Sequence, residues 1–270
     1  MNRRLLMTLF FVLCAAAAGA ADVPQPDELV QKAIAAAGGE AFSKIGVLKL
    51  EVSAEQILHE GSTKVETFTA YVDTASKLAN LRIEYPGDVV VARVGANGWS
   101  TAGGVLDERP QTASMAYRTL NQTLFTLLLP FSLEMEGVWA KEVVETTWEG
   151  REAWALLLPF TKGFFVSPVL ETIWRVVIDK ETHAVLAADF MPPVRYREVE
   201  KVGVRYGILA HHEIEGAKIP AHILSVGLSL ESQETGDYRV TKIKSSVWDD
   251  GWAPALFVNP QQLEALEGEE

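Results

Sequence analysis

The spacing of apolar residues changes twice along the chain. Over residues 27–37 they recur every three or four positions, which predicts an amphipathic helix. Asp27 is placed to cap the start of this helix, and Gly38 can end it in the left-handed conformation. A second short helical turn is expected over residues 40–44.

From Val47 onward the period becomes two. Leu48 and Leu50 alternate with Lys49 and Glu51, which predicts a strand with one buried and one wet face. About eleven strands are expected, at residues 47–55, 65–72, 79–85, 89–94, 138–148, 153–158, 173–178, 185–190, 204–213, 221–230 and 238–247. The first connections, including a turn expected at 95–98, are too short for crossover helices, so this part of the sheet is antiparallel.

Residues 112–129 interrupt this rhythm with a helical pattern that Pro130 ends. The segment 124–131 contains Thr126 as its one polar residue. We therefore expect this end of the helix to be buried on several sides or to touch something apolar that is not protein.

Together these patterns predict a mainly β (α+β) fold. A sheet of about eleven strands is expected to curl, so we predict a strongly curved antiparallel sheet forming an incomplete barrel, with helices over its concave face. The chain has no visible repeat and no linker rich enough to divide it. Residues 22–270 are therefore expected to form a single domain.

The first 21 residues have the pattern of a cleaved export signal. Arg3 and Arg4 precede an apolar stretch over 5–13, and small residues follow up to Ala21. Two alternatives remain: a permanent membrane anchor, and lipidation at Cys14. With cleavage after Ala20 or Ala21, the mature protein is expected in the periplasm.

The amino-acid composition excludes several classes of function. The net charge is −12, and without Arg3 and Arg4 there are 22 basic residues against 36 acidic ones, or −14. A nucleic-acid partner bound through its phosphates is therefore not expected. The single Cys excludes a disulfide within the chain and a metal site built from several thiolates.

The strands carry an unusual number of indole rings, since the chain has seven Trp residues. One interpretation is that they are ordinary core and edge residues. The other is that several line a cavity for a hydrophobic guest, because ligand pockets are mainly apolar and aromatic. Strand parity and the apolar helix end select the residues expected to line it: Trp99, Leu124, Leu128, Trp154, Trp174, Val176, Leu186 and Phe190.

Six segments occur in the order found in outer-membrane lipoprotein-sorting proteins of the LolA/LolB-like superfamily: the helix ending at Gly38-Gly39, residues 81–88, Asn97-Gly98-Trp99, 124–130, 174–182 and 256–260. The chain resembles this superfamily over most of 27–260. The resemblance implies an exported, incomplete β-barrel whose helix-lidded cavity takes lipid acyl chains. The chain is longer than the classical carrier, and only Arg82 and Arg93 are candidates for its lid-locking arginine, so a relative of unassigned function is expected.

The sequence therefore favours a periplasmic, monomeric binding protein for a lipid, a lipoprotein acyl chain or another hydrophobic ligand, without cofactor, metal or catalytic group. One alternative is an envelope module that docks a protein partner. Another is a metal-assisted hydrolase, in which His211 and His222 face each other across a hairpin and bind zinc with Glu213.

Overall fold

The computed structural model describes residues 23–58, 60–86, 89–94, 97–109, 111–160, 164, 173–191, 203–228, 234–249 and 256–258. The expected export signal lies outside these residues. Among them, no helix has both the length and the apolar character to cross a membrane.

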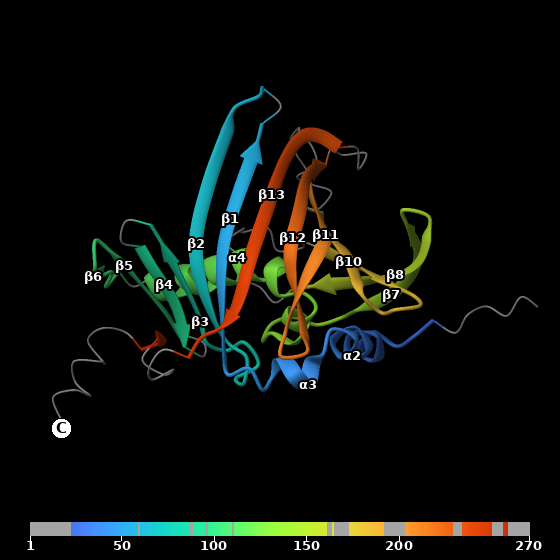
Figure 1. Ribbon diagram of the computed structural model, residues 1–270, viewed down its shortest axis with the longest axis horizontal. Helices are drawn as coiled ribbons and strands as arrows, with labels where there is room; N and C mark the ends of the chain where they lie inside the picture. Colours follow the sequence, from blue (N-terminus) through green and yellow to red (C-terminus); the bar gives the residue numbers. More distant parts are fainter. Residues whose placement is uncertain are drawn as a thin grey trace, which may run out of the picture.

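Within the described residues, thirteen strands form one antiparallel sheet (Figure 1). The strands are β1 (Val47–Ile57), β2 (Thr63–Asp73), β3 (Leu81–Tyr85), β4 (Val89–Val94), β5 (Asn97–Ala102), β6 (Val105–Leu106), β7 (Glu142–Trp148), β8 (Arg151–Pro159), β9 (Ile173–Asp179), β10 (Val185–Met191), β11 (Gly203–Ile214), β12 (Ala217–Leu228) and β13 (Glu234–Val247).

The two halves of the chain meet where β1 pairs with β13 at the centre of the sheet. From that seam β2–β6 extend to one side and β12–β7 to the other, each strand beside its neighbour in sequence. β6 and β7 are the two edges and do not pair with each other. The prediction of a curved, incomplete barrel is confirmed, with β5 and β6 added to the expected strands.

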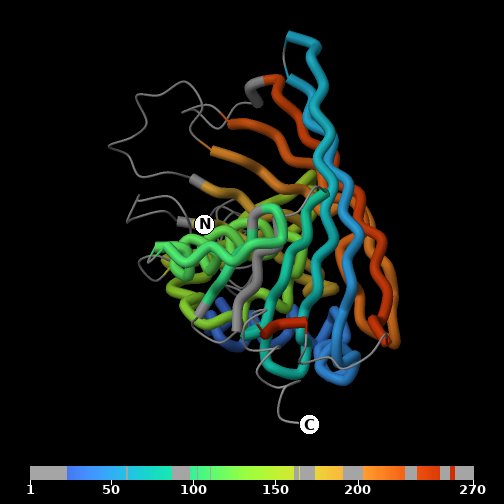
Figure 2. The backbone as a smooth tube through the Cα atoms, turned by 90° about the vertical axis from the view of Figure 1, so that its left-hand side faces the viewer, coloured from blue at the N-terminus to red at the C-terminus, as the bar shows by residue number. Residues whose placement is uncertain are grey.

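The central strands bury alternate residues against the concave side of the sheet, which we call the inner face. On β1, Leu48, Leu50 and Val52 are buried there, whereas Glu51 and Ser53 are exposed on the opposite, outer face. Figure 2 shows α4 (Thr112–Leu124) on the inner side of the curved sheet. The core lies between them, which is the arrangement that the sequence pattern predicts.

The predicted helix over 112–129 is shorter than expected. α4 ends at Leu124 and is followed by two 3₁₀ turns, η1 (Thr126–Leu128) and η2 (Phe131–Glu134). Ser132 donates its hydroxyl hydrogen to the Phe125 carbonyl at 2.7 Å, which satisfies a backbone group left free by the helix end. The whole stretch 124–133 is buried, as its composition predicts.

α2 (Pro26–Ala36) and α3 (Gly39–Phe42) close one end of the core. The N-cap is Gln25 rather than the predicted Asp27, because Pro26 suits the first helical position, where its missing N–H costs nothing. Gly38 adopts the predicted left-handed conformation at φ 82°. A Cβ there would lie 2.2 Å from the Gly216 carbonyl oxygen, so only glycine lets the helices approach the β11–β12 turn.

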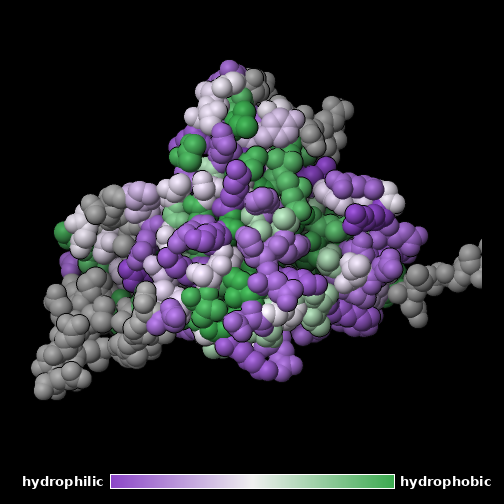
Figure 3. All heavy atoms as spheres, in the orientation of Figure 1, coloured by the Kyte–Doolittle hydropathy of each residue, from purple (hydrophilic) through white to green (hydrophobic). Residues whose placement is uncertain are grey.

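The outer face is mixed in character. Figure 3, which views it, shows hydrophilic and hydrophobic residues interspersed, with hydrophobic ones gathered toward the upper end. On β9–β11 the buried Asp189 carboxylate is paired with both Arg175 and Arg205, the latter at 3.0 Å. These three charges lie opposite the inner face and take no part in the core.

Gly98 lies where β5 comes closest to α4. A Cβ at Gly98 would lie 2.6 Å from the Ala113 carbonyl oxygen and 2.9 Å from the Ala116 Cβ atom. The prediction of a turn at 95–98 was wrong for Asn97 and Gly98, which belong to β5. Gly98 is required because α4 packs directly on the strand at this position, and not because a turn needs it.

We predict that Gly98→Ala lowers the free energy of unfolding by about 1–3 kcal/mol, since α4 has to move away from the sheet. Urea denaturation followed by circular dichroism measures this. Gly207→Ala is the matched control, because its Cβ would meet the Leu224 carbonyl oxygen at an ordinary 3.8 Å. Equal unfolding free energies for the two variants would contradict the packing argument.

Candidate functional site

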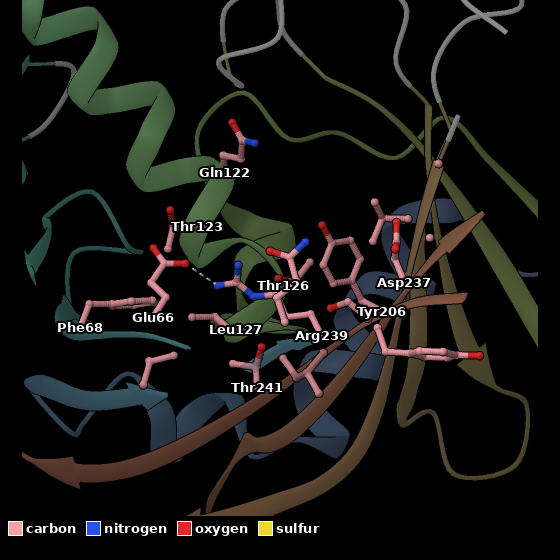
Figure 4. Close-up of a pocket in the computed structure, with 18 residues that line it drawn as sticks. Glu66, Phe68, Gln122, Thr123, Thr126, Leu127, Tyr206, Asp237, Arg239 and Thr241 are labelled. Atoms are coloured by element: carbon pink, nitrogen blue, oxygen red, sulfur yellow. Dashed lines mark hydrogen bonds and ion pairs between the residues drawn. The ribbon is translucent and has the colours of Figure 1, made fainter. Parts of the chain in front are cut away.

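A cavity of 440 Å³ lies between the inner face of the central strands and the C-terminal end of α4 (Figure 4). Its wall is formed by β1, β2, β11, β12 and β13, and its inner cover by the end of α4 and by η1. This volume is within the range of about 300–1,000 Å³ that is typical of small-molecule sites. The cavity is the candidate functional site.

The lining combines apolar and polar groups. Apolar side chains come from Val52, Phe68, Leu127, Val204 and Ile223. Hydroxyl groups come from the buried Thr126, Ser225 and Thr241. Amide groups come from Gln56 and Gln122, and charged groups come from Glu66, Asp237 and Arg239. The cavity thus fits a molecule that has an apolar part and a polar part.

The charged part of the lining is organised by one ion pair. Arg239 Nη2 lies 2.9 Å from Glu66 Oε2, and Figure 4 shows the two side chains pointing toward each other from β13 and β2. They reach each other diagonally across β1, on which Glu66 is opposite Ala54 and Arg239 is opposite Gln56. Both are more than a third exposed, so the pair contributes only about 0–1 kcal/mol to stability. Its role in the site is to position the two groups.

Tyr206 joins the cavity to the aromatic core. It lines the cavity from β11, and its ring stacks on Trp174 with centroids 5.6 Å apart. Burial raises the pKa of the Tyr206 phenol above its ordinary value. Burial also raises the pKa of Tyr85, whose ring contacts Phe68 at 5.6 Å. Both phenols therefore remain neutral hydrogen-bonding groups at neutral pH.

None of the eight residues predicted to line a cavity is among those lining this one. Leu124, Leu128, Trp154, Trp174 and Val176 are buried in the main core. Phe190 is partly buried and packs against the same core. Contact of these six with a ligand stays a prediction; in the structure they fill the part of the interior beside the cavity.

Trp99 and Leu186 lie on the outer face, which corrects the predicted orientation of both. Because Gly98 faces α4, alternation turns Trp99 outward, where its indole N–H donates to the Phe257 carbonyl at 3.2 Å. An irregularity between Val185 and Ala187 shifts the parity of β10. Leu186 accordingly packs with Ala187 in a separate outer cluster.

Sequence reasoning missed the residues that do line the cavity, because it searched for large apolar rings. The signal that could have found them is polar residues at inner-facing positions. Glu66 and Thr241 are opposite the buried Ala54, and Arg239 is opposite the buried Ser225. Polar groups at core-parity positions of β2 and β13, the two strands that flank β1, indicate a wall that is not filled by protein.

Arg82, a candidate for the lid-locking arginine, lies on the outer face. It alternates with the fully buried Leu81 and Ile83 and donates from Nη1 to the Leu256 carbonyl at 2.8 Å. Together with Trp99 it holds residues 256–258 against the sheet. It is therefore not placed to hold a helix over the inner face. The Arg93 side chain lies outside those described.

The zinc site of the hydrolase alternative is not assembled in the described residues. The turn centres on Glu215 and Gly216, so His211 is opposite Pro220 and His222 is opposite Ala210. Burial lowers the pKa of His211. The described part of the chain contains no group of three or more His, Cys, Asp or Glu residues arranged for a metal ion.

Comparisons with known proteins agree with the geometry. No protein-family model and no curated protein sequence matches the chain. A LolA superfamily protein from Nitrosomonas europaea is similar in structure, with a TM-score of 0.58 at 9% identity, over 88% of this chain and 99% of that one. A DUF1329 family protein from Desulfovibrio piger gives a TM-score of 0.57 at 13% identity, over 87% and 98%.

A third similar structure is an outer-membrane lipoprotein-sorting protein domain from Vibrio parahaemolyticus. Its TM-score is 0.50 at 7% identity, over 88% of this chain and 99% of that one. The resemblance predicted from the order of sequence segments is confirmed: the chain has a LolA-like fold. At these identities the likeness defines the fold and leaves the ligand to be argued from the cavity.

The raised pKa of Tyr206 gives a testable pH dependence. In the unfolded chain the phenol ionises near pH 10, whereas in the folded protein it keeps its proton to higher pH. The contribution of Tyr206 to the free energy of unfolding is therefore fully present below about pH 10. It is lost as the pH rises toward the pKa of the phenol in the folded protein. We predict that Tyr206→Phe reduces the loss of stability between about pH 9 and pH 11, measured as the urea midpoint. An unchanged loss would contradict the burial of this phenol.

Proposed function

We propose that this chain is a binding protein for a lipid, a lipoprotein acyl chain or another ligand with an apolar part, held between the curved sheet and α4. The observation that carries the proposal is the 440 Å³ cavity, which has an apolar floor and a polar upper wall. The LolA-like fold supports it, because one of the similar structures is described as a lipoprotein-sorting domain.

Burial of an acyl segment supplies the affinity. Each methylene group transferred from water into the apolar part of the cavity contributes about 0.8 kcal/mol. Val52, Phe68, Leu127 and Ile223 form the surface that receives it. The side chains of the wall act by burial and hydrogen bonding, so the proposal assigns the chain no chemical reaction.

We further propose that residues 1–21 direct export, that 22–270 form one mature domain, and that this domain acts as a monomer in the periplasm. The charge pattern of 1–21 supports the first point. The continuous sheet supports the second, because β1 near the start of the domain pairs with β13 near its end.

A second candidate function is an envelope module that binds a protein partner. The observation in its favour is the filled interior beside the cavity, where five of the residues predicted to contact ligand pack in the main core instead. If the protein is such a module, the cavity binds no ligand, and no lipid accompanies the protein when it is purified.

Native mass spectrometry of protein purified from the periplasm of its expressing cell tests the proposal. We expect a bound lipid species that organic extraction removes. Protein that carries no lipid, and that fails to bind an added fluorescent fatty acid, would contradict the proposed function and favour the interaction module.

A cavity-filling substitution separates binding in the cavity from binding to the surface. We predict that Thr241→Trp lowers lipid occupancy at least tenfold, since the buried Thr241 lines the cavity and an indole would occupy it. Lys242→Trp is the matched control, because Lys242 is the next residue along β13 and is exposed on the outer face. Native mass spectrometry measures both occupancies, and an equal loss in the two variants would argue against the cavity.

A further inference from the structure

The wall of the cavity changes its chemistry step by step along the strands. Residues on one face of a strand repeat every second position, about 7 Å apart. The cross-strand register therefore sorts the lining into three tiers. Each tier is named by its residue on β1: Val52 marks the lower tier, Ala54 the middle tier and Gln56 the upper tier.

The lower tier is apolar. Val52 is directly opposite Phe68 on β2 and Ile243 on β13, and Leu127 from η1 completes the floor. In the middle tier, Ala54 is opposite Thr241, which is in turn opposite Ile223. The buried Thr241 hydroxyl therefore places a polar group on the β13 wall one step above the floor.

The upper tier is polar and charged. Gln56 is opposite Arg239, which is opposite the buried Ser225. Glu66 on β2, which is opposite Ala54, reaches across β1 and accepts a hydrogen bond from Nη2 of the Arg239 guanidinium, which has five N–H donors in all. Asp237 lines the cavity one step further along β13. The described lining therefore carries one positive and two negative side chains above its apolar floor.

Volume limits how much apolar material fits. A methylene group occupies nearly the space of a water molecule, ~30 Å³, so 440 Å³ admits about fifteen such groups. That is room for one acyl chain, or for part of one chain with its polar linkage, and not for two long chains. This volume therefore favours a ligand with one acyl chain over a ligand with two.

Resting on the proposed function, we propose that the ligand is a single-chain zwitterionic phospholipid. Its acyl end lies against Val52 and Phe68, and its ester region lies at the Thr241 and Ser225 hydroxyls. Its phosphate accepts hydrogen bonds from the Arg239 guanidinium, a geometry that arginine suits. Its ammonium group lies near the carboxylate of Glu66, beside the same guanidinium. An anionic lipid satisfies Arg239 but brings its negative charge beside the Glu66 carboxylate, and a neutral lipid makes neither charged contact.

The test compares three lipids with one acyl chain in common, each below its micellar concentration: a lysophosphatidylethanolamine, a lysophosphatidylglycerol and a monoacylglycerol. Native mass spectrometry measures the dissociation constants. We expect the wild type to bind the ethanolamine lipid about tenfold more tightly than either of the others, the order expected for one charge-assisted hydrogen bond.

Two variants assign the selectivity to residues. Arg239→Ala is expected to weaken binding of both phospholipids about tenfold and to leave the monoacylglycerol unchanged. Glu66→Gln is expected to bring the two phospholipids to similar affinity. Lys242→Ala, which removes an exposed charge from the outer face, is the control and is expected to change none of the three constants. Circular dichroism and the urea midpoint show that each variant is folded.

The outcomes distinguish this inference from the proposed function. Equal binding of the three lipids by the wild type, with Thr241→Trp still blocking them, would overturn the headgroup inference and leave the cavity function standing. Loss of monoacylglycerol binding in Arg239→Ala would show a structural role for this arginine and would also overturn the inference. Failure of every lipid to bind would overturn both. Displacement of bound lipid by equimolar glycerophosphoethanolamine, which lacks the acyl chain, would show that the headgroup alone is the ligand.

Discussion

The pairing of β1 with β13 is the constraint on which the rest of the structure depends. It joins residues 48–57 to residues 238–247 over ten consecutive positions and so makes one sheet from the first and last strands. Because facing residues share a side of the sheet, this register also decides what meets on the inner face. A slip of one position would turn Val52, Ala54 and Gln56 to solvent and would remove both the core and the cavity wall together.

The same alternation builds two different interiors. Under the middle of α4 and around Trp174 the inward residues are large and apolar, and they pack with the helix and the 3₁₀ turns in the main core. Toward the upper ends of β1, β2 and β13 the inward positions become Gln56, Glu66 and Arg239. Charged side chains stay near water, so the protein does not close over them and a cavity remains.

The fold could be predicted from the sequence because it rests on local signals that are consistent with one another. The period of two from Val47 onward, the short connections and the apolar stretch before Pro130 lead to a curved antiparallel sheet with a covering helix. The site could not be predicted in the same way. Trp99 turns outward because Gly98 is needed at the helix contact, and Leu186 turns outward because β10 is irregular. Both depend on packing distances and register that composition does not contain.

The polar wall also explains how the empty protein stays stable. An unfilled apolar cavity costs about 24 cal/mol per Å³, so 440 Å³ of it would cost about 10 kcal/mol, as much as the whole stability of many domains. A cavity with Thr241, Ser225, Gln56 and the ion pair on its wall can hold water instead, because each water finds several polar partners there. Such a cavity needs no locked lid to protect it before the ligand arrives, which agrees with the position of Arg82 on the far side of the sheet. Its ligand then has to replace water at the polar tiers as well as fill the apolar floor, and this requirement selects an amphiphile over a plain hydrocarbon chain.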